Sequence, residues 1–282
     1  MQIEVTDFVA GARKARGVAV IIDVFRAFSV ACYAYARGAK RIIPMAGIDE
    51  SLALKEAHPE YLTIGEREGK RVDGFDFGNS PTDISQADVR GRTIVHTTSA
   101  GTQGLTNASG ADVVLTGSLV NAAAICEYIR KLAPEQVSIV RMGHAAIERC
   151  AEDDLCAELL HARLSGNEYD ISGVRDRLRS APAAKKFFDP AATWAPEGDF
   201  DLCTDVDRFG FVDVILRKRG WEKATRGRGK TRLGKTCVAN QSRLGYQVAC
   251  PCARFNDRAR VWLRRAFASG PKNRCRRRGR WP

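Results

Sequence analysis

Residues 18–29 read VAVIIDVFRAFS, and this stretch decides the class of fold. Its first five residues form a continuous apolar run, which is typical of a strand buried on both faces of a parallel sheet. A helical pattern follows from Ala27 to Arg37, and Gly38 stands where helices commonly end. This strand-and-helix unit predicts an α/β fold.

Similar units recur along the chain. Apolar runs predict further strands at residues 41–45, 61–65, 92–96, 112–116 and 137–141, and helical patterns lie at residues 49–57, 101–109, 121–132 and 152–164. Strands that alternate with helices favour a mostly parallel sheet covered by helices on both faces. We therefore expect an α/β region over residues 1–216, with a division into two α/β halves left open near residues 104–110.

The net charge of +12 is unevenly distributed. Residues 217–282, called the basic tail here, carry 21 Lys and Arg against two acids, whereas residues 1–216 carry 24 Lys and Arg against 31 acids. The basic tail lacks a sustained hydrophobic period, so we expect it to be disordered or to be an out-of-frame translation. Nucleic-acid binding is expected only through this tail and is the less favoured interpretation.

The cellular setting is inferred from what the chain lacks. No apolar run approaches the roughly 18 residues of a membrane span, and the N-terminal residues do not read as a secretory signal. The five cysteines before residue 217 fit reduced thiols. We expect a cytoplasmic protein without membrane contact, and leave a homo-oligomer open.

Polar residues follow most of the expected strands. Ligands of open α/β sheets bind beyond the carboxyl ends of the strands, so these residues form a candidate site. The segment from His96 to Thr102 offers hydroxyls and backbone N–H groups at a helix start, which suit a phosphate or another anion. Arg26 and Arg67 can each hold a phosphate, carboxylate or sulfonate through two parallel hydrogen bonds.

Carboxylates at the same strand ends suit magnesium. Mg²⁺ prefers oxygen ligands and usually takes one or two carboxylates together with waters and substrate oxygens. The available acids are Asp23, Glu66, Asp76, Glu152 and Asp153. Structural interpretations compete with this one: Ser and Thr can cap a helix, and Glu152 and Asp153 can complement a helix dipole.

Taken together, the loops resemble the 2-phosphosulfolactate phosphatase family. The resemblance rests on IDVFRAFS (22–29), GFDFGNSPTDI (74–84), TIVHTTSAGTQG (93–104), LTGSLVNA (115–122), EDDLCAE (152–158) and PEGDFDLCTDVDRFGFV (196–212). It implies a Mg²⁺-dependent acid phosphatase that converts 2-phospho-3-sulfolactate to 3-sulfolactate and phosphate, a step of coenzyme M biosynthesis. The substrate would be a small anionic phosphate ester.

With this resemblance, roles can be assigned as hypotheses. The catalytic residues would be Asp23, Arg26, Arg67, His96 and Ser99, with His96 or a carboxylate handling protons. The metal ligands would come from Asp23, Asp76, Glu152 and Asp153. The substrate-binding residues would be Ser29, Asn79, Ser80, Thr97, Thr98, Gly101, Thr102, Ser118 and Asn121.

Two other functions stay open. The first is a phosphatase of another small phosphocarboxylate, and the second is a non-catalytic protein that binds an anion or RNA through the basic tail. The Asp-x-Asp-x-Thr/Val pattern of aspartyl-phosphate enzymes is absent, because Phe209 ends the segment that begins at Asp205. A metal-activated water is therefore favoured over a covalent intermediate.

Overall fold

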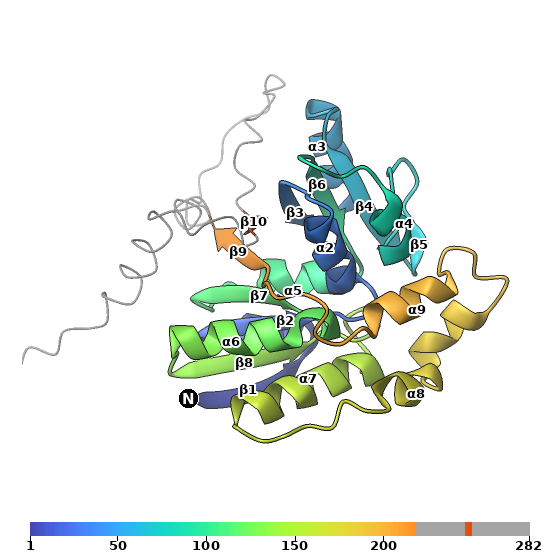
Figure 1. Ribbon diagram of the computed structural model, residues 1–282. Coiled ribbons are helices and arrows are strands. Elements are labelled where there is room, and N and C mark those ends of the chain that lie inside the picture. Colours follow the sequence, from blue (N-terminus) through green and yellow to red (C-terminus); the bar gives the residue numbers. More distant parts are fainter. Residues whose placement is uncertain (218–245, 250–282) are drawn as a thin grey trace, which may run out of the picture. The chain divides into compact units, whose positions relative to one another are not determined.

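The computed structural model describes residues 1–217 and 246–249, and Figure 1 shows how their helices and strands are arranged. Met1–Cys250 forms one compact unit, and the second unit, Pro251–Pro282, lies outside the described residues. Most of the basic tail, and the expectation about its disorder or origin, lies outside them too. The strands are β1 (Gln2–Asp7), β2 (Val18–Ile22), β3 (Arg41–Met45), β4 (Leu62–Arg67), β5 (Lys70–Arg71), β6 (Thr93–Thr97), β7 (Val113–Gly117), β8 (Gln136–Arg141), β9 (Val214–Arg217) and β10 (Tyr246–Ala249).

Helices join these strands. They are α1 (Phe8–Lys14), α2 (Ala27–Ala36), α3 (Ile48–Ala57), α4 (Pro81–Gln86), α5 (Gly101–Asn107), α6 (Ala122–Leu132), α7 (Ala151–Leu164), α8 (Val174–Arg179) and α9 (Glu197–Cys203), with short 3₁₀ helices η1 (Leu119–Asn121) and η2 (Pro182–Phe188). Among the described residues, no helix combines the length and apolar composition that a membrane crossing requires.

The sheet contains two sets of parallel strands. Its order is β1-β8-β2-β7-β9-β10-β3-β6-β4-β5, in which β1, β8, β2 and β7 form one parallel set and β3, β6 and β4 form the other. The pairs β7–β9, β9–β10 and β10–β3 are all antiparallel. Three reversals of direction separate the sets, and Figure 1 shows their strands lying at a steep angle to each other.

The core explains why the central strands are uniformly apolar. All five residues of β2 are buried. Val18, Val20 and Ile22 pack in a cluster with residues of α6 and α7, whereas Ala19 and Ile21 pack in a second cluster with residues of α2 and α5. Because successive side chains of a strand point to opposite faces, this packing requires helices on both sides of the sheet. The predicted α/β class with a mostly parallel sheet is therefore confirmed.

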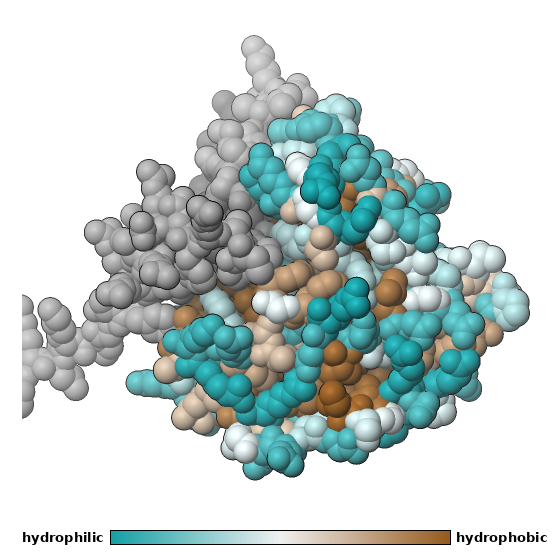
Figure 2. All heavy atoms as spheres, viewed as in Figure 1, coloured by the Kyte–Doolittle hydropathy of each residue, from teal (hydrophilic) through white to brown (hydrophobic). Residues whose placement is uncertain are grey.

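The surface is mainly polar on the face drawn in Figure 2. Hydrophilic residues cover most of the upper part of this face, and hydrophobic residues gather in the lower half of the view, over α6 and α7.

The division of the α/β region into two halves near residues 104–110 stays a prediction. The two strand sets do not follow chain order, because β2 lies with β7 and β8 rather than with β3.

Candidate functional site

Three carboxylates meet where β2 and β8 end; we call Asp23, Glu152 and Asp153 the acidic cluster. Asp23 directly follows β2, and the other two lie in the first turn of α7. Asp153 accepts hydrogen bonds from Val24 N at 2.9 Å and from Gly143 N at 2.8 Å. A single carboxylate therefore fixes the ends of two neighbouring strands against the start of α7.

The acidic cluster holds more negative charge than its surroundings neutralise. Burial, and then the charge of Glu66, raise the pKa of Asp23 to about 6, and burial is the main cause that raises the pKa of Glu152 to about 7. The pKa of Asp153 is also raised by burial and by its two acidic neighbours. Glu152 is 3 % exposed, and its Oε2 has no hydrogen-bond partner among the described residues.

These features fit a magnesium ion better than a transition metal. The donors are carboxylate oxygens, and one of them is buried without a partner. In the described part of the chain, no group of three or more His, Cys, Asp or Glu side chains is arranged to hold a metal ion by itself. Mg²⁺ does not require one, because waters and substrate oxygens fill most of its coordination positions.

The loop between β6 and α5 reaches the acidic cluster. Gly101 N donates a hydrogen bond to Asp23 Oδ2 at 2.8 Å, and Ser99 N donates one to Glu66 Oε1 at 2.7 Å. Thr98 and Thr102 cap each other, with Thr98 N donating to Thr102 Oγ1 and Thr102 N to Thr98 Oγ1. The loop expected to hold an anion thus lies beside Asp23, and in this structure its donors contact carboxylates and hydroxyls of the protein.

Arg67 offers a positive charge next to this loop. Its NH2 donates to Thr97 Oγ1 at 3.1 Å, and its NH1 donates to the Glu66 carbonyl at 2.6 Å. The residue is half-buried, and within the described residues no carboxylate lies at ion-pair distance from its guanidinium. Arg67 can therefore bind an anionic ligand without first breaking an ion pair.

Arg26 is in a different situation, because protein groups already occupy its guanidinium. Its NH1 forms a 2.7 Å ion pair with Asp199 Oδ2 and donates to the Trp194 carbonyl, also at 2.7 Å, while NH2 donates to the Gly69 carbonyl at 2.8 Å. The side chains of Arg26 and Asp199 are 1 % and 0 % exposed. This geometry favours a positioning role over direct contact with a substrate.

His96 lies in a buried environment that keeps its ring neutral. It is 3 % exposed, and its Nε2 lies 3.3 Å from Asn79 Oδ1. Burial lowers the pKa of His96 from 6.5 to about 4. A ring with this pKa is unprotonated near neutral pH, so His96 cannot act as a general acid there.

Several expected substrate-binding residues contact one another. Ser29 Oγ and Ser118 Oγ are 2.7 Å apart, and Asn121 Oδ1 accepts from Ser118 N. Ser80 Oγ donates to Asp199 Oδ1 at 2.7 Å and caps α4. All four side chains are buried in the structure, so a direct contact with substrate stays a prediction for each of them.

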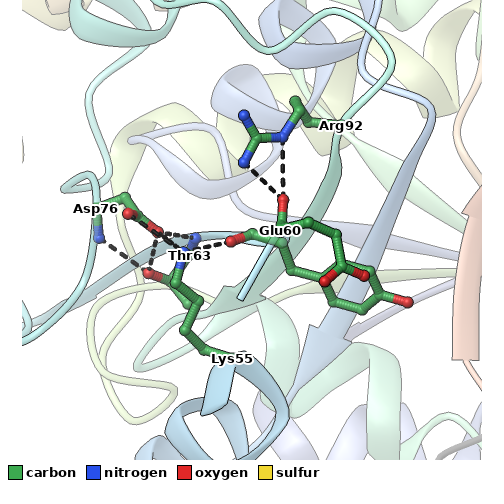
Figure 3. Close-up of polar contacts among 6 residues, drawn as sticks. Lys55, Glu60, Thr63, Asp76 and Arg92 are labelled. Carbon is green, nitrogen blue, oxygen red and sulfur yellow. Dashed lines mark hydrogen bonds and ion pairs between the residues drawn. The ribbon is translucent and has the colours of Figure 1, made fainter. Parts of the chain in front are cut away.

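Asp76 lies in a separate polar group, shown in Figure 3. Its carboxylate accepts hydrogen bonds from Thr63 N at 2.7 Å and Thr63 Oγ1 at 2.8 Å, and it pairs with Lys55 at 3.1 Å. Burial acts to raise the pKa of Asp76, but these hydrogen bonds outweigh it and lower the pKa. The structure therefore does not bring Asp76 into the acidic cluster, and it connects α3 to β4 instead.

Two residues near the site were not singled out by their sequence pattern. Asp199 occurs in the PEGDFD motif, whose match to the family was the only available signal. Lys186 lies in η2, within a stretch that reads as irregular, and nothing in its sequence surroundings distinguishes it from Lys185. Only the fold places these residues close to Arg26 and the acidic cluster.

Comparisons with known proteins show the family of this chain. A family model described as 2-phosphosulpholactate phosphatase matches residues 6–215. A protein of Bacillus subtilis (strain 168) named "Probable 2-phosphosulfolactate phosphatase" is 30 % identical over 187 residues, which are 66 % of this chain and 81 % of the relative. Proteins of the same name from Clostridium acetobutylicum and Gloeobacter violaceus are 36 % and 38 % identical, over 69 % and 64 % of this chain and 74 % and 71 % of the relatives.

The matched region spans the strand ends that carry the acidic cluster, the β6–α5 loop and Arg67. It also contains nearly all the residues that the structure describes. Since the family model matches well over half of the residues, the chain belongs to the 2-phosphosulpholactate phosphatase family, a family of phosphoric monoester hydrolases.

Proposed function

We propose that this protein hydrolyses 2-phospho-3-sulfolactate to 3-sulfolactate and phosphate, and that the reaction depends on Mg²⁺. The acidic cluster is the observation that carries the proposal. Three carboxylates are buried together with raised pKa values, and one of their oxygens has no hydrogen-bond partner among the described residues. A divalent cation offsets such an accumulation of negative charge.

Glu152 and Asp23 are the best candidates to hold the ion. Glu152 has an oxygen without a partner, and Asp23 faces the loop of residues 98–101. Both oxygens of Asp153 accept from backbone N–H groups, as those of Asp23 do, but the donors to Asp153 lie at the strand ends, so its main role is to keep these ends in place. A bound Mg²⁺ supplies positive charge that polarises a phosphoryl oxygen.

The rest of the site suits a substrate with several negative charges. Arg67 supplies a charge that no carboxylate of the described residues neutralises. Ser99 supplies a hydroxyl and a backbone N–H next to Glu66. Glu66 accepts from Ser99 N at 2.7 Å and from Ser99 Oγ at 3.3 Å, so this carboxylate fixes the position of Ser99 in the loop.

The first test is a phosphate-release assay with the full-length chain. We expect activity on 2-phospho-3-sulfolactate with Mg²⁺, loss of activity with EDTA, and recovery when Mg²⁺ is added back. A panel of other phosphocarboxylates tests substrate choice, because a better substrate among them would replace the proposed one. RNA binding with no phosphate release from any ester would contradict the proposal.

The second test distinguishes the role of Glu152 from that of Asp154, another acid in the first turn of α7. Glu152→Gln keeps the shape of the side chain and removes its charge, so we expect kcat/KM to fall by about 100-fold and the Mg²⁺ requirement to rise. Asp154→Asn is the matched control, because Asp154 pairs with Arg141 at 3.1 Å and Arg149 at 2.9 Å and is partly exposed. Equal activity of the two variants would exclude Glu152 from the site.

A further inference from the structure

Lys186 lies on η2, and aromatic packing fixes this segment against the chain that follows Asp23. The rings of Phe187 and Phe25 meet edge to face with their centroids 5.1 Å apart, and Phe187 also packs near Phe200 at 6.1 Å. Because Phe25 precedes Arg26 and lies two residues after Asp23, the packing brings η2 to the acidic cluster. Lys186 is thus held near the site by its immediate neighbour in the chain.

The ammonium of Lys186 has no polar partner in the described part of the chain. Its Nζ lies 5.1 Å from the centre of the Phe187 ring, and neither a hydrogen bond nor an ion pair connects it to any described residue. The residue is half-buried, so water only partly solvates it. Burying an ammonium without a partner costs free energy, and this makes Lys186 a candidate for binding an anion.

Lys186 interacts with charges of both signs, those of Arg26 and of the acidic cluster. Burial and then the charge of Arg26 lower the pKa of Lys186, whereas Glu152 and Asp23 act in the opposite direction. Lys186 in turn lowers the pKa of both carboxylates, although burial raises them overall. The ammonium is therefore close enough to the acidic cluster to interact with it, but too far from it to form an ion pair.

We propose that Lys186 binds the phosphoryl group of the substrate beside the acidic cluster. This inference rests on the proposed phosphatase function. A phosphoryl group next to the carboxylates carries negative oxygens, and the half-buried ammonium supplies the donors that these oxygens lack. Arg26 cannot do this without leaving Asp199, because its guanidinium donates to three protein groups.

The test compares two adjacent lysines in the full-length protein. Lys186→Met keeps the length and apolar stem of the side chain, and Lys185→Met is the matched control because Lys185 is exposed on the same segment. For Lys186→Met we expect KM and the inhibition constant of inorganic phosphate to rise by about 10- to 100-fold, the loss typical of a hydrogen bond between charged groups. Lys186→Arg should recover part of the phosphate affinity, and Lys185→Met should resemble the wild type.

The Mg²⁺ requirement and the melting temperature of Lys186→Met distinguish a purely structural role of Lys186 from phosphate binding. If Lys186→Met changes only the Mg²⁺ requirement or the melting temperature, and phosphate still inhibits as in the wild type, the proposal is wrong. If the wild type hydrolyses no phosphate ester, the proposed function fails separately. Calorimetric titration of the full-length chain with inorganic phosphate and Mg²⁺ then still tests Lys186, since binding must weaken in Lys186→Met and not in Lys185→Met.

Discussion

Single carboxylates at this site each connect two separate segments of the chain. Asp23 accepts from Ala27 N and Gly101 N, which joins the start of α2 to the start of α5. Glu66 accepts from Ser99 N and Gly69 N, which joins the β6–α5 loop to the turn between β4 and β5. Replacing either carboxylate therefore changes the positions of two loops as well as the charge of the site.

His96 should make the protein sensitive to acid. Its pKa is 6.5 when exposed and about 4 in the fold, so the folded state disfavours the charged ring. The stability contribution of the neutral ring is fully present above pH 6.5 and is lost as the pH falls towards 4. Between pH 7 and pH 4.5 this amounts to about 2–3 kcal/mol of unfolding free energy.

The variant His96→Gln isolates this effect, because glutamine does not titrate and can still bond to Asn79. Urea unfolding at several pH values should show a smaller loss of stability in the variant than in the wild type as the pH falls. Stability curves that stay parallel from pH 7 to pH 4.5 would show that His96 does not titrate as expected.

At the scale of elements, α5 packs against β2 with almost no space. A Cβ atom added at Gly104 would lie 2.5 Å from Ile21 Cγ2 and 2.5 Å from Met142 Sδ. Ile21 is β-branched and restricted at χ1, so it cannot easily move aside. Only glycine at this position allows α5 to lie close enough for Gly101 to reach Asp23.

Gly104→Ala should therefore destabilise the protein by about 1–3 kcal/mol, despite the better helix propensity of alanine. Gly210→Ala is the control, because a Cβ at Gly210 meets no heavy atom within 4 Å. Thermal unfolding of both variants measures the difference. A melting temperature of Gly104→Ala equal to that of the control would mean that α5 can shift without cost.

The sequence predicts individual elements better than their arrangement. The six expected strands correspond to β2, β3, β4, β6, β7 and β8, since short apolar runs between turns and helices are typical of buried strands. The edge strand β1 was not expected, because none of its residues is buried and it contains Glu4. Hydrophobic periodicity does not encode strand direction, so the reversal between the two parallel sets could not be predicted.

The sequence also predicted some features of the site and missed others. The rule about strand ends predicts that the β6–α5 loop lies near Asp23, and the hydrogen bond from Gly101 N confirms this proximity, although β6 belongs to the strand set that runs opposite to β2. The partner of Arg26 is Asp199, 173 residues further along the chain, and local patterns contain no information about such a pair. The same applies to Lys186, whose only distinguishing feature is its place in three dimensions.

At the scale of the whole molecule, the ion pair of Arg26 and Asp199 joins distant parts of the chain. Asp199 also accepts from Ser80 Oγ and Thr82 N, so the group includes α9, the start of α2, the start of α4 and the turn at Gly69. Removing one partner of a buried ion pair typically lowers the free energy of unfolding by about 3–5 kcal/mol, and we expect a loss of this size here.

Asp199→Asn tests this ion pair. We expect a loss of about 3–5 kcal/mol in unfolding free energy, measured by urea denaturation. Asp201→Asn on the same helix is the control, because its ion pair with Arg175 is 3.4 Å long and about half exposed, and such pairs contribute little. Similar stability of the two variants would show that the buried pair is not required for folding.

Because the two strand sets run in opposite directions, their alignment with each other matters for how correct folding of this protein is measured. Moving a strand by one residue relative to its neighbour shifts its end by about 3.3 Å, more than a hydrogen bond can stretch. Such a slip between the sets would separate Gly101 from Asp23 while leaving each set internally paired. Circular dichroism would hardly register the change, whereas turnover would stop, so enzymatic rate is the more sensitive gauge of correct strand alignment.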